Sequence, residues 1–375
     1  MPDADRPIPY VNLQAQFEEE GDELLAVVTA ALKRADFVGG AAVGELEKAL
    51  ADFHGVADAV ALNSGTDALI LAMRALGVGR GDEVITPANS FIASTAAIMH
   101  VGATPVLVDV QPDQNIDPDA VERAVTSRTK AIMPVHLTGR VADMGRIAAL
   151  AERRGLLVIE DAAQAIGSGL DGRLAGAMGD FGCFSAHPLK NLNACGDAGF
   201  LITNRSDLAE RIRRLRNHGM ADRNTVAEFG LVSRMDTLQA AILAMRLKRL
   251  PGVIERRRRN AALYDSLLDR NLIFIPPDRE GEFNTFHTYV IQVDRRDALQ
   301  AHLAARGIGT AIHYPVPIHL QPAAASLGYR PGDFPVAEAQ AGRILTLPIN
   351  QFLTPDDIER VAGEVNAFLR NRDFP

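Results

Sequence analysis

The stretch CFSAHPLKNLNACGDAGFL, residues 183–201, places Lys190 among small and apolar neighbours, whereas most lysines lie on wet surfaces. An apolar setting disfavours the charged ammonium and lowers the pKa of a lysine. The neutral amine that results is a nucleophile. Lys190 is therefore the first candidate for a catalytic group, and a surface lysine is the alternative.

The stretch ALNSGTDALILAM, residues 61–73, carries a second candidate. A strand is expected to end at Asn63 and a helix to begin after Ser64, with Ser64 and Asp67 at the spacing of a capping box. A helix start with free N–H groups beside a hydroxyl can bind phosphate. An ordinary capped helix is the simpler interpretation of this stretch alone. The chain has no Walker lysine pattern and no GxGxxG, so nucleotide-cofactor motifs are not supported.

The stretch LLVIEDAAQAIG, residues 156–167, ends a predicted strand at Asp161, with Gln164 three residues later. In a parallel sheet, ligands bind beyond the carboxyl ends of the strands, so the Asp161 carboxylate would face that crevice. A helix N-cap is the alternative role. A phosphate cradle, a strand-end carboxylate and a nucleophilic lysine together are what pyridoxal 5′-phosphate (PLP) requires. The sequence thus predicts PLP as cofactor, with Lys190 and Asp161 as catalytic residues.

The elements that would position these groups alternate over the first two thirds of the chain. Continuous apolar runs predict buried strands, and near-helical spacing of apolar residues predicts helices between them. The strands are expected at 58–63, 82–87, 104–110, 130–137 and 155–163, and the helices at 66–76, 90–102 and 144–155. This alternation predicts an α/β fold with a mostly parallel central sheet flanked by helices.

Beyond about residue 205 the pattern becomes mainly helical. Helices are expected at 207–219 and 234–270, the second bent or broken near Pro251. A strand at 285–293 and a helix at 296–307 follow. We therefore predict a large cofactor-binding domain over residues 1–250 and a smaller C-terminal α+β domain over 251–375.

Charge and composition exclude several classes of protein. A net charge of −8 over 375 residues argues against nucleic acid as a partner, and the run Arg256–Arg259 is interpreted as a solvated helix face. No basic-then-apolar leader and no apolar run of roughly 20 residues occurs, so no membrane association is expected. Cys183 and Cys195 are expected to be free thiols in a reducing cytoplasm, with no metal site.

Many short motifs also occur in one order along most of the chain: NSGTDAL, GDEVITPANSFIAS, GATPVLVDV, NIDPDAVE, TKAIMPVHLTG, VIEDAAQAIG, GDFGCFSAHPLKNLNACGDAG, RNHG, SRMDTLQAAIL and IHYPVPIHLQPA. In these motifs the chain resembles the DegT/DnrJ/EryC1/StrS sugar aminotransferases. The resemblance implies the type I fold of PLP-dependent transferases. It also implies a homodimer with active sites at the subunit interface.

The resemblance further implies a role for each matching residue. Lys190 would bind the cofactor covalently, Asp161 would hold the pyridine nitrogen protonated, and Gln164 would touch the ring hydroxyl. The cofactor phosphate would be bound by Gly65, Thr66 and Ser185, and Phe91 would stack on the cofactor ring. The sugar substrate would be contacted by His313, Tyr314 and His319. For the two histidines a structural role is the alternative.

The reaction implied is transfer of an amino group from an amino acid, L-glutamate in the family, to a keto-sugar. The form HPLKNLNACGDAG is similar to that of members that aminate C3, which predicts a nucleotide-linked 3-keto hexose. A 4-keto sugar or a cyclitol ketone is an alternative. So is a PLP-dependent sugar dehydratase, in which histidine replaces the lysine: Lys190 argues against it, and His187 keeps it open.

Two further functions are less favoured. A binding or regulatory protein would be expected to have lost Lys190 or Asp161, and neither is lost. A nicotinamide dehydrogenase would be expected to carry a glycine fingerprint, which is absent.

The chain departs from the family at three positions. Members commonly carry GxNSRxD, whose asparagine reaches the cofactor phosphate of the neighbouring subunit, whereas this chain has GLVSRMD with Val232 there. Valine cannot donate a hydrogen bond, so Ser233 or the backbone would have to replace the contact. Ala186 and Thr138, often aromatic and tyrosine in relatives, could widen the pocket.

Overall fold

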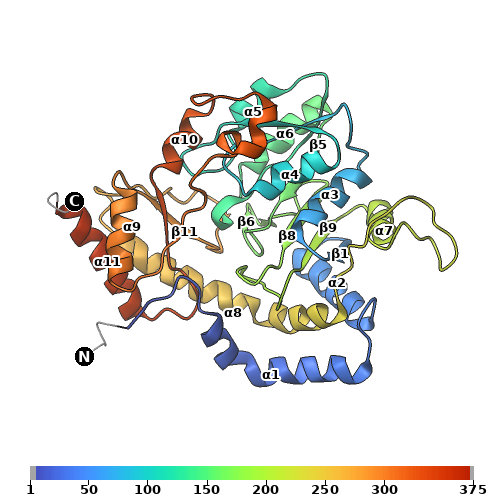
Figure 1. Ribbon diagram of the computed structural model, residues 1–375, viewed down its shortest axis with the longest axis horizontal. Helices are drawn as coiled ribbons and strands as arrows, with labels where there is room; N and C mark the ends of the chain where they lie inside the picture. Colours follow the sequence, from blue (N-terminus) through green and yellow to red (C-terminus); the bar gives the residue numbers. More distant parts are fainter. Residues whose placement is uncertain (1–5, 372–375) are drawn as a thin grey trace.

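A seven-stranded sheet forms the centre of the computed structural model, which describes residues 6–371 (Figure 1). The strand order is β1-β9-β8-β5-β4-β2-β3. Each pairing is parallel except the two made by β9, which is antiparallel to β1 and β8. The strands are β1 (Asp58–Leu62), β2 (Glu83–Pro87), β3 (Thr104–Val108), β4 (Thr129–Ile132), β5 (Leu157–Asp161), β8 (Phe181–Ser185) and β9 (Gly199–Thr203). The predicted α/β fold with a mostly parallel sheet is confirmed.

Helices cover both faces of this sheet, because successive strand residues point to opposite sides. In β1, Ala59 and Ala61 belong to the core beneath α2, α5, α6 and α8. Val60 and Leu62 belong to the core beneath α3, α4 and α7. These helices are α2 (Ala41–His54), α3 (Gly65–Ala75), α4 (Ile92–His100), α5 (Pro118–Ala124), α6 (Met144–Arg154), α7 (Ser206–Leu215) and α8 (Thr237–Leu267).

The C-terminal part has its own core around an antiparallel pair, β11 (Tyr289–Gln292) and β12 (Ile344–Leu347). α9 (Arg296–Ala305), α11 (Pro355–Arg370) and the end of α8 pack around this pair. Shorter elements complete the chain: β6 (Gly169–Leu170), β7 (Arg173–Leu174), β10 (Glu282–Phe283), α10 (Pro335–Ala341) and the 3-10 turns η1 (Leu137–Gly139), η2 (Ile318–Leu320) and η3 (Pro322–Leu327).

α8 connects the two parts and runs through Pro251 without a break, so of the predicted bend or break the break does not occur. α1 (Leu13–Arg34), α2 and α11 pack against α8. This packing supports the helix where the proline removes a hydrogen bond. The predicted boundary between residues 250 and 251 falls inside α8, and we keep the division into residues 1–250 and 251–375 as a proposal.

The arginine run on α8 is not the solvated face that the sequence predicted. Arg256 pairs with Glu19 of α1 at 2.7 Å, and the Arg258 guanidinium lies over the ring of Phe283, 4.0 Å from its centroid. Arg257 is only 6% exposed. The side chains do point in several directions, but for Arg257 the prediction is wrong, since this residue faces the interior.

Within residues 6–371, no helix is both long and apolar enough to cross a membrane. The same residues hold no group of three or more His, Cys, Asp and Glu side chains arranged to bind a metal ion. Cys183 is buried and Cys195 is exposed, and both are free thiols.

Candidate active site

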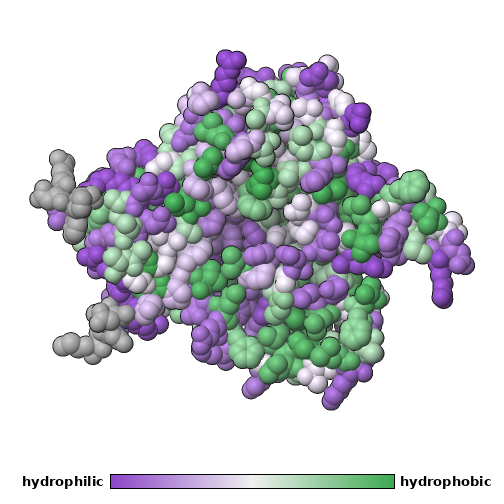
Figure 2. All heavy atoms as spheres, in the orientation of Figure 1, coloured by the Kyte–Doolittle hydropathy of each residue, from purple (hydrophilic) through white to green (hydrophobic). Residues whose placement is uncertain are grey.

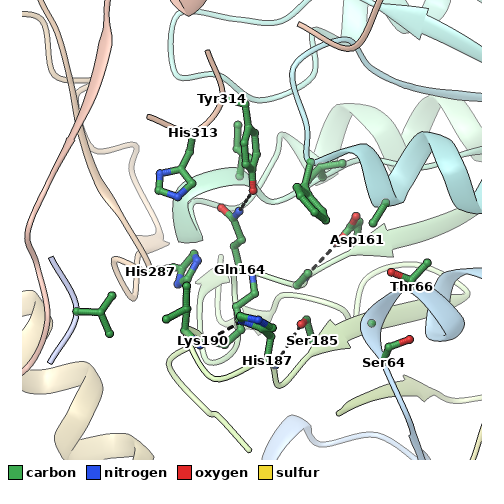
Figure 3. A pocket seen from close by; sticks show the side chains of 18 of the residues that line it. Ser64, Thr66, Asp161, Gln164, Ser185, His187, Lys190, His287, His313 and Tyr314 are labelled. Atoms are coloured by element: carbon green, nitrogen blue, oxygen red, sulfur yellow. Dashed lines mark hydrogen bonds between the residues drawn. The ribbon is translucent and has the colours of Figure 1, made fainter. Parts of the chain in front are cut away.

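A cavity of about 350 Å³ lies where the sheet, the start of α3 and the C-terminal part meet. The structure brings to it all seven residues predicted to bind the cofactor and two of the three predicted to bind substrate. They are Gly65, Thr66, Phe91, Asp161, Gln164, Ser185 and Lys190, with His313 and Tyr314. In Figure 3, Ser64, Thr66 and Asp161 lie on one side of the cavity, His287 and His313 lie on the other, and Lys190 and Gln164 lie between.

Lys190 lies in the loop 186–198 that joins β8 to β9, two strands that the sequence did not predict. Its backbone N–H donates to the His187 carbonyl at 2.9 Å, which closes a turn at the cavity floor. Burial lowers the pKa of Lys190 from 10.5 to about 8, against the opposing effect of the Asp161 charge. Roughly a tenth of this lysine is therefore the neutral amine at pH 7, far more than for a lysine with the ordinary pKa.

Asp161 is the last residue of β5, and strand alternation directs it into the cavity. The preceding Glu160 points the other way, where it accepts from the backbone N–H groups of Met178 and Gly179 at 2.7 and 2.6 Å. Asp161 Oδ2 accepts from Ser94 Oγ at 2.7 Å, and Oδ1 accepts from the Ala163 N–H at 3.2 Å. Burial raises the pKa of Asp161, while these two bonds and Lys190 act against the rise.

The start of α3 forms the third part of the cavity. Ser64 caps the helix, since its Oγ accepts from the Asp67 N–H at 3.1 Å, and the N–H groups of Gly65 and Thr66, in the first turn, have no partner within the helix. Position 65 must be glycine, because a Cβ there would lie 2.9 Å from the Cβ of Ser185. The close approach brings the Ser185 side chain beside the helix start, as an anion site requires.

Gln164 links the two sides of the cavity. Its Oε1 accepts from the Thr138 N–H at 2.8 Å, and its Nε2 donates to the Tyr314 hydroxyl at 3.3 Å. Phe91 lies near Tyr314, with ring centroids 5.6 Å apart, and 55% of its surface is exposed. We call Gly65, Thr66, Asp161, Gln164, Ser185 and Lys190 the sheet wall.

Residues far apart in the chain build the opposite side, which we call the far wall: Tyr10, Arg257, His287, His313 and Asn350. His313 Nδ1 lies 2.9 Å from Thr346 Oγ1 of β12, and burial lowers the pKa of His313 to about 4. Burial and nearby positive charges also lower the pKa of His287 well below its usual range. Both imidazoles are therefore neutral at ordinary pH.

A family model described as the DegT/DnrJ/EryC1/StrS aminotransferase family matches residues 18–366. The chain belongs to this family. Over 363 residues it is 44% identical to UDP-N-acetyl-3-dehydro-alpha-D-glucosamine 3-aminotransferase of Acidithiobacillus ferrooxidans, covering 96% of this chain and 98% of the relative. Over 368 residues it is 42% identical to a "pleiotropic regulatory protein" of Geobacillus stearothermophilus, covering 97% and 99%.

The crystal structure of DesV from S. venezuelae superposes with a TM-score of 0.95 at 41% identity, covering 98% of this chain and all of that one. The chain is thus a PLP-dependent sugar aminotransferase with the type I transferase fold, and the predicted family, enzyme class and cofactor are confirmed.

The sheet wall fits PLP on the chemistry of its donors. The tight contact between Gly65 and Ser185 leaves a helix start and a hydroxyl to bind a phosphate. The buried Asp161 carboxylate could pair with a ring nitrogen, and the Lys190 amine could bind an aldehyde. The wall thus provides one group for each reactive part of an aminotransferase's cofactor.

The structure does not bring His319 to the cavity. Its imidazole is buried against Phe334, and Nε2 lies 2.9 Å from Glu338 Oε1. Glu338 also accepts from the Gly332 N–H at 2.8 Å, so His319 helps to hold the segment around α10. We therefore leave His319 out of the proposed site.

Sequence reasoning missed several lining residues, among them Tyr10, Arg257, His287 and Asn350, and considered His187 only for the dehydratase alternative. Arg257 was noticed only as part of an arginine run. The spacing of the apolar residues along α8 could have indicated that one of the four arginines points inward, because neighbouring helical positions face different directions.

The departures at 232 and 138 have different settings. Val232 is 53% exposed on residues 216–236, an arm that leaves α7 and projects from the body (Figure 1). Ser233 is fully buried, with its Oγ donating to Asn63 Oδ1 at 3.2 Å, so its hydroxyl is already engaged within its own subunit. Thr138 is buried beside the cavity residue Leu137 but does not line the cavity itself, and its backbone N–H donates to Gln164 Oε1.

Proposed function

We propose that this aminotransferase takes an amino group from L-glutamate and delivers it to C3 of a nucleotide-linked 3-keto hexose. One observation carries the proposal: Lys190, Asp161 and the start of α3 line a single cavity. The relative from A. ferrooxidans is named for amination at C3 of a UDP-linked sugar, which supports the choice of substrate class.

Each residue of the sheet wall has a proposed contact with PLP. Gly65, Thr66 and Ser185 bind the phosphate, Asp161 pairs with the pyridine nitrogen, and Gln164 contacts the ring hydroxyl. Phe91, at the mouth, stacks on the ring. When bound, PLP accepts the electron pair that is left when a proton leaves the carbon that bears the amine.

Lys190 has two proposed tasks. Its neutral amine binds the cofactor in the resting enzyme, which the lowered pKa favours. During the reaction its Nζ would act as a general base that takes the proton from the donor's α-carbon, and then as a general acid that gives this proton to the cofactor carbon to which Lys190 had been bound.

Asp161 keeps the pyridine nitrogen protonated. Alone, a buried carboxyl resists ionisation. A positively charged ring nitrogen beside it would favour the carboxylate, and the Ser94 hydroxyl and Ala163 N–H already hold both oxygens in place. The carboxylate is thus oriented before the cofactor binds.

His313 and Tyr314 are the proposed sugar contacts. His313 is neutral, and Thr346 holds its Nδ1, so its Nε2 is the ring nitrogen left for substrate. The hydroxyl of Tyr314 connects through Gln164 to the sheet wall. A sugar bound here would lie beside the cofactor ring.

We also propose a homodimer in the cytoplasm. The projecting arm carries strongly exposed apolar residues, Phe229 at 91% and Val226 at 58%, and Phe91 and Leu189 are exposed at the cavity mouth. Figure 2 shows further apolar side chains gathered on the lower part of the molecule, where α1 lies. Such surfaces are typical of protein interfaces. The two free thiols fit a reducing compartment.

The decisive experiment for the catalytic assignment is borohydride reduction of the holoenzyme followed by peptide mapping. The cofactor is expected on Lys190, and an adduct on another residue would refute the assignment. L-Glutamate should then convert the bound cofactor to its amine form in the absence of sugar. A panel of 3-keto and 4-keto nucleotide sugars and a cyclitol ketone identifies the acceptor, with 3-keto sugars expected to react fastest.

The relative from G. stearothermophilus bears the name of a regulatory protein, so regulation without turnover is the second candidate. The presence of both Lys190 and Asp161 in the cavity supports turnover. Failure of every amino acid to convert the bound cofactor would favour the regulatory function.

A further inference from the structure

Arg257 of the far wall has no part in the function described so far. Its side chain lines the cavity yet is only 6% exposed. Nη1 donates to two backbone carbonyls, that of Phe286 at 3.0 Å and that of His287 at 3.3 Å. These bonds hold the guanidinium beside His287, which also lines the cavity.

The charge of Arg257 has no counter-ion in the part of the chain that the structure describes. Arg256, its neighbour on α8, pairs with Glu19 at 2.7 Å, but Arg257 forms no ion pair with any carboxylate among residues 6–371. Its Nε is buried without a hydrogen-bond partner, and burial lowers its pKa to about 10. Buried charges are normally paired, because removing an ion from water is costly. An anion in the cavity would supply the missing charge.

A guanidinium is suited to two kinds of anion, carboxylate and phosphate. Both substrates of the proposed reaction carry one: the amino donor has carboxylates, and a nucleotide-linked sugar has a diphosphate. The cavity, at about 350 Å³, is near the lower end of ligand sites. It is too small to enclose the cofactor together with a whole nucleotide-sugar, so the diphosphate and nucleoside must extend past the mouth. A small amino acid can lie fully inside.

The depth of Arg257 therefore favours the amino donor. We propose that Arg257 binds a carboxylate of the amino donor and thereby positions the donor's amino group toward the Lys190 side of the cavity. This inference rests on the proposed function, since it requires an amino-acid donor. It makes Arg257 a specificity-determining residue: an amine without a carboxylate leaves its charge unpaired.

The test measures the two half-reactions of the holoenzyme separately. In the first, L-glutamate converts the bound cofactor to its amine form. The second half-reaction is measured in reverse. The 3-amino nucleotide-sugar product, which has no amino-acid carboxylate, converts the bound cofactor to its amine form. Arg257→Gln is expected to raise the half-saturating concentration of L-glutamate about 10- to 100-fold, as for loss of a charge-assisted hydrogen bond. The half-saturating concentration of the amino sugar should change by less than about threefold.

A non-reacting probe gives a readout that is independent of turnover. Glutarate carries two carboxylates and no amine, so it can only bind. Calorimetry should detect glutarate binding to the wild-type holoenzyme and at least about tenfold weaker binding to Arg257→Gln.

Arg258→Gln is the matched control, because Arg258 follows on the same helix, donates to the Asn284 carbonyl at 2.7 Å and does not line the cavity. It should leave both half-reactions unchanged. If Arg257→Gln does not fold, Arg257→Lys replaces it, since lysine keeps the charge and can still donate to a carbonyl. A smaller loss of affinity, again confined to L-glutamate and glutarate, is then expected.

Three outcomes overturn the inference: unchanged affinity for L-glutamate, equal losses for L-glutamate and the amino sugar, or a loss confined to the amino sugar. The last would assign Arg257 to the diphosphate. If the wild-type enzyme reacts with no amino acid at all, the proposed function fails instead, so the two failures are distinguishable.

Discussion

The sheet wall and the far wall of the cavity differ in how their polar groups are satisfied. On the sheet wall, Asp161 accepts two hydrogen bonds and Gln164 makes two. On the far wall, the Nδ1 of His287 and the Nε of Arg257 are buried without partners. The side chains of Asp161 and Gln164 are thus held in place before any ligand binds, whereas two buried nitrogens of the far wall have no partner within the protein.

This difference fits the order of events in the proposed reaction. A resident cofactor benefits from a preorganised site, because fixed dipoles need no rearrangement during reaction. Two different substrates bind in the same cavity in turn, so the polar groups that contact them cannot all be hydrogen-bonded within the protein beforehand. Substitutions on the sheet wall should therefore affect cofactor binding and kcat, and those on the far wall should affect KM.

The largest effect is expected from Asp161→Asn on the sheet wall. Asparagine keeps the shape and can still accept one hydrogen bond, but it removes the charge that keeps the ring nitrogen protonated. We expect kcat to fall roughly 100- to 1,000-fold, as when a positioned electrostatic group is lost, with little change in thermal stability. Steady-state kinetics and thermal unfolding measure both. An unchanged kcat would remove Asp161 from the mechanism.

The second prediction concerns the pH dependence of the cofactor-free protein. The pKa of Lys190 is about 8 in the folded protein and about 10.5 when unfolded, so between these values the unfolded state binds more protons. Stability contributed by Lys190 therefore rises with pH from about 8 to 10.5, by about 3 kcal/mol. Denaturant unfolding of wild type and Lys190→Met across this range isolates the effect. If the difference in unfolding free energy between wild type and Lys190→Met does not change with pH, the lowered pKa is contradicted.

The sheet wall was largely predictable from sequence because its residues follow local signals. Asp161 ends an apolar run, and Ser64 begins a periodic one, so each group could be placed at the end of an element. Lys190 stood out by the composition of its surroundings. β8 and β9, which hold its loop, were missed, since Gly-rich stretches around 179–199 give a weak strand signal.

The far wall was not predictable in the same way. Tyr10, Arg257, His287 and Asn350 meet only through tertiary packing, and nothing in the local sequence brings them together. Long-range packing also explains the errors elsewhere: the helices around α8 carry it through Pro251, and Glu338 engages His319. From the motif IHYPVPIHL we predicted both His313 and His319 near the substrate, but only His313 reaches the cavity.

Gly65→Ala tests whether the sheet wall depends on close contact. The added Cβ would lie 2.9 Å from Ser185 Cβ, and overpacking of this kind costs about 1–3 kcal/mol. We expect cofactor affinity to fall about 10-fold or more. Gly44→Ala in α2 is the control, since a Cβ there meets nothing within 4 Å. It should stabilise the protein slightly. Equal cofactor affinities in the two variants would show that contact at position 65 is unimportant.

On the far wall, His313→Ala should raise KM for the sugar about 10-fold, the cost of one lost hydrogen bond or somewhat more. Cofactor affinity and the half-reaction with L-glutamate should hardly change. Thr346→Val, which removes the partner of His313 Nδ1, should reproduce a smaller part of the KM effect if Thr346 positions the ring. A fall in kcat without a change in KM would erase the distinction between the walls.

The smallest effect is expected at Val232, where the family's asparagine would reach the partner subunit's cofactor. Val232→Asn restores one donor, worth about 0.5–1.5 kcal/mol, so cofactor dissociation should slow by a few-fold in the proposed dimer. Val336→Asn is a matched control, since Val336 is also an exposed valine but lies on α10, away from the arm and the cavity, and it should leave dissociation unchanged. Cofactor dissociation is measured by dilution at high and at low protein concentration. This separates the contact across subunits from the contacts within one subunit, because the former is lost when the dimer separates. If Val232→Asn has no effect at high concentration, the sheet wall of one subunit holds the phosphate without help from the other.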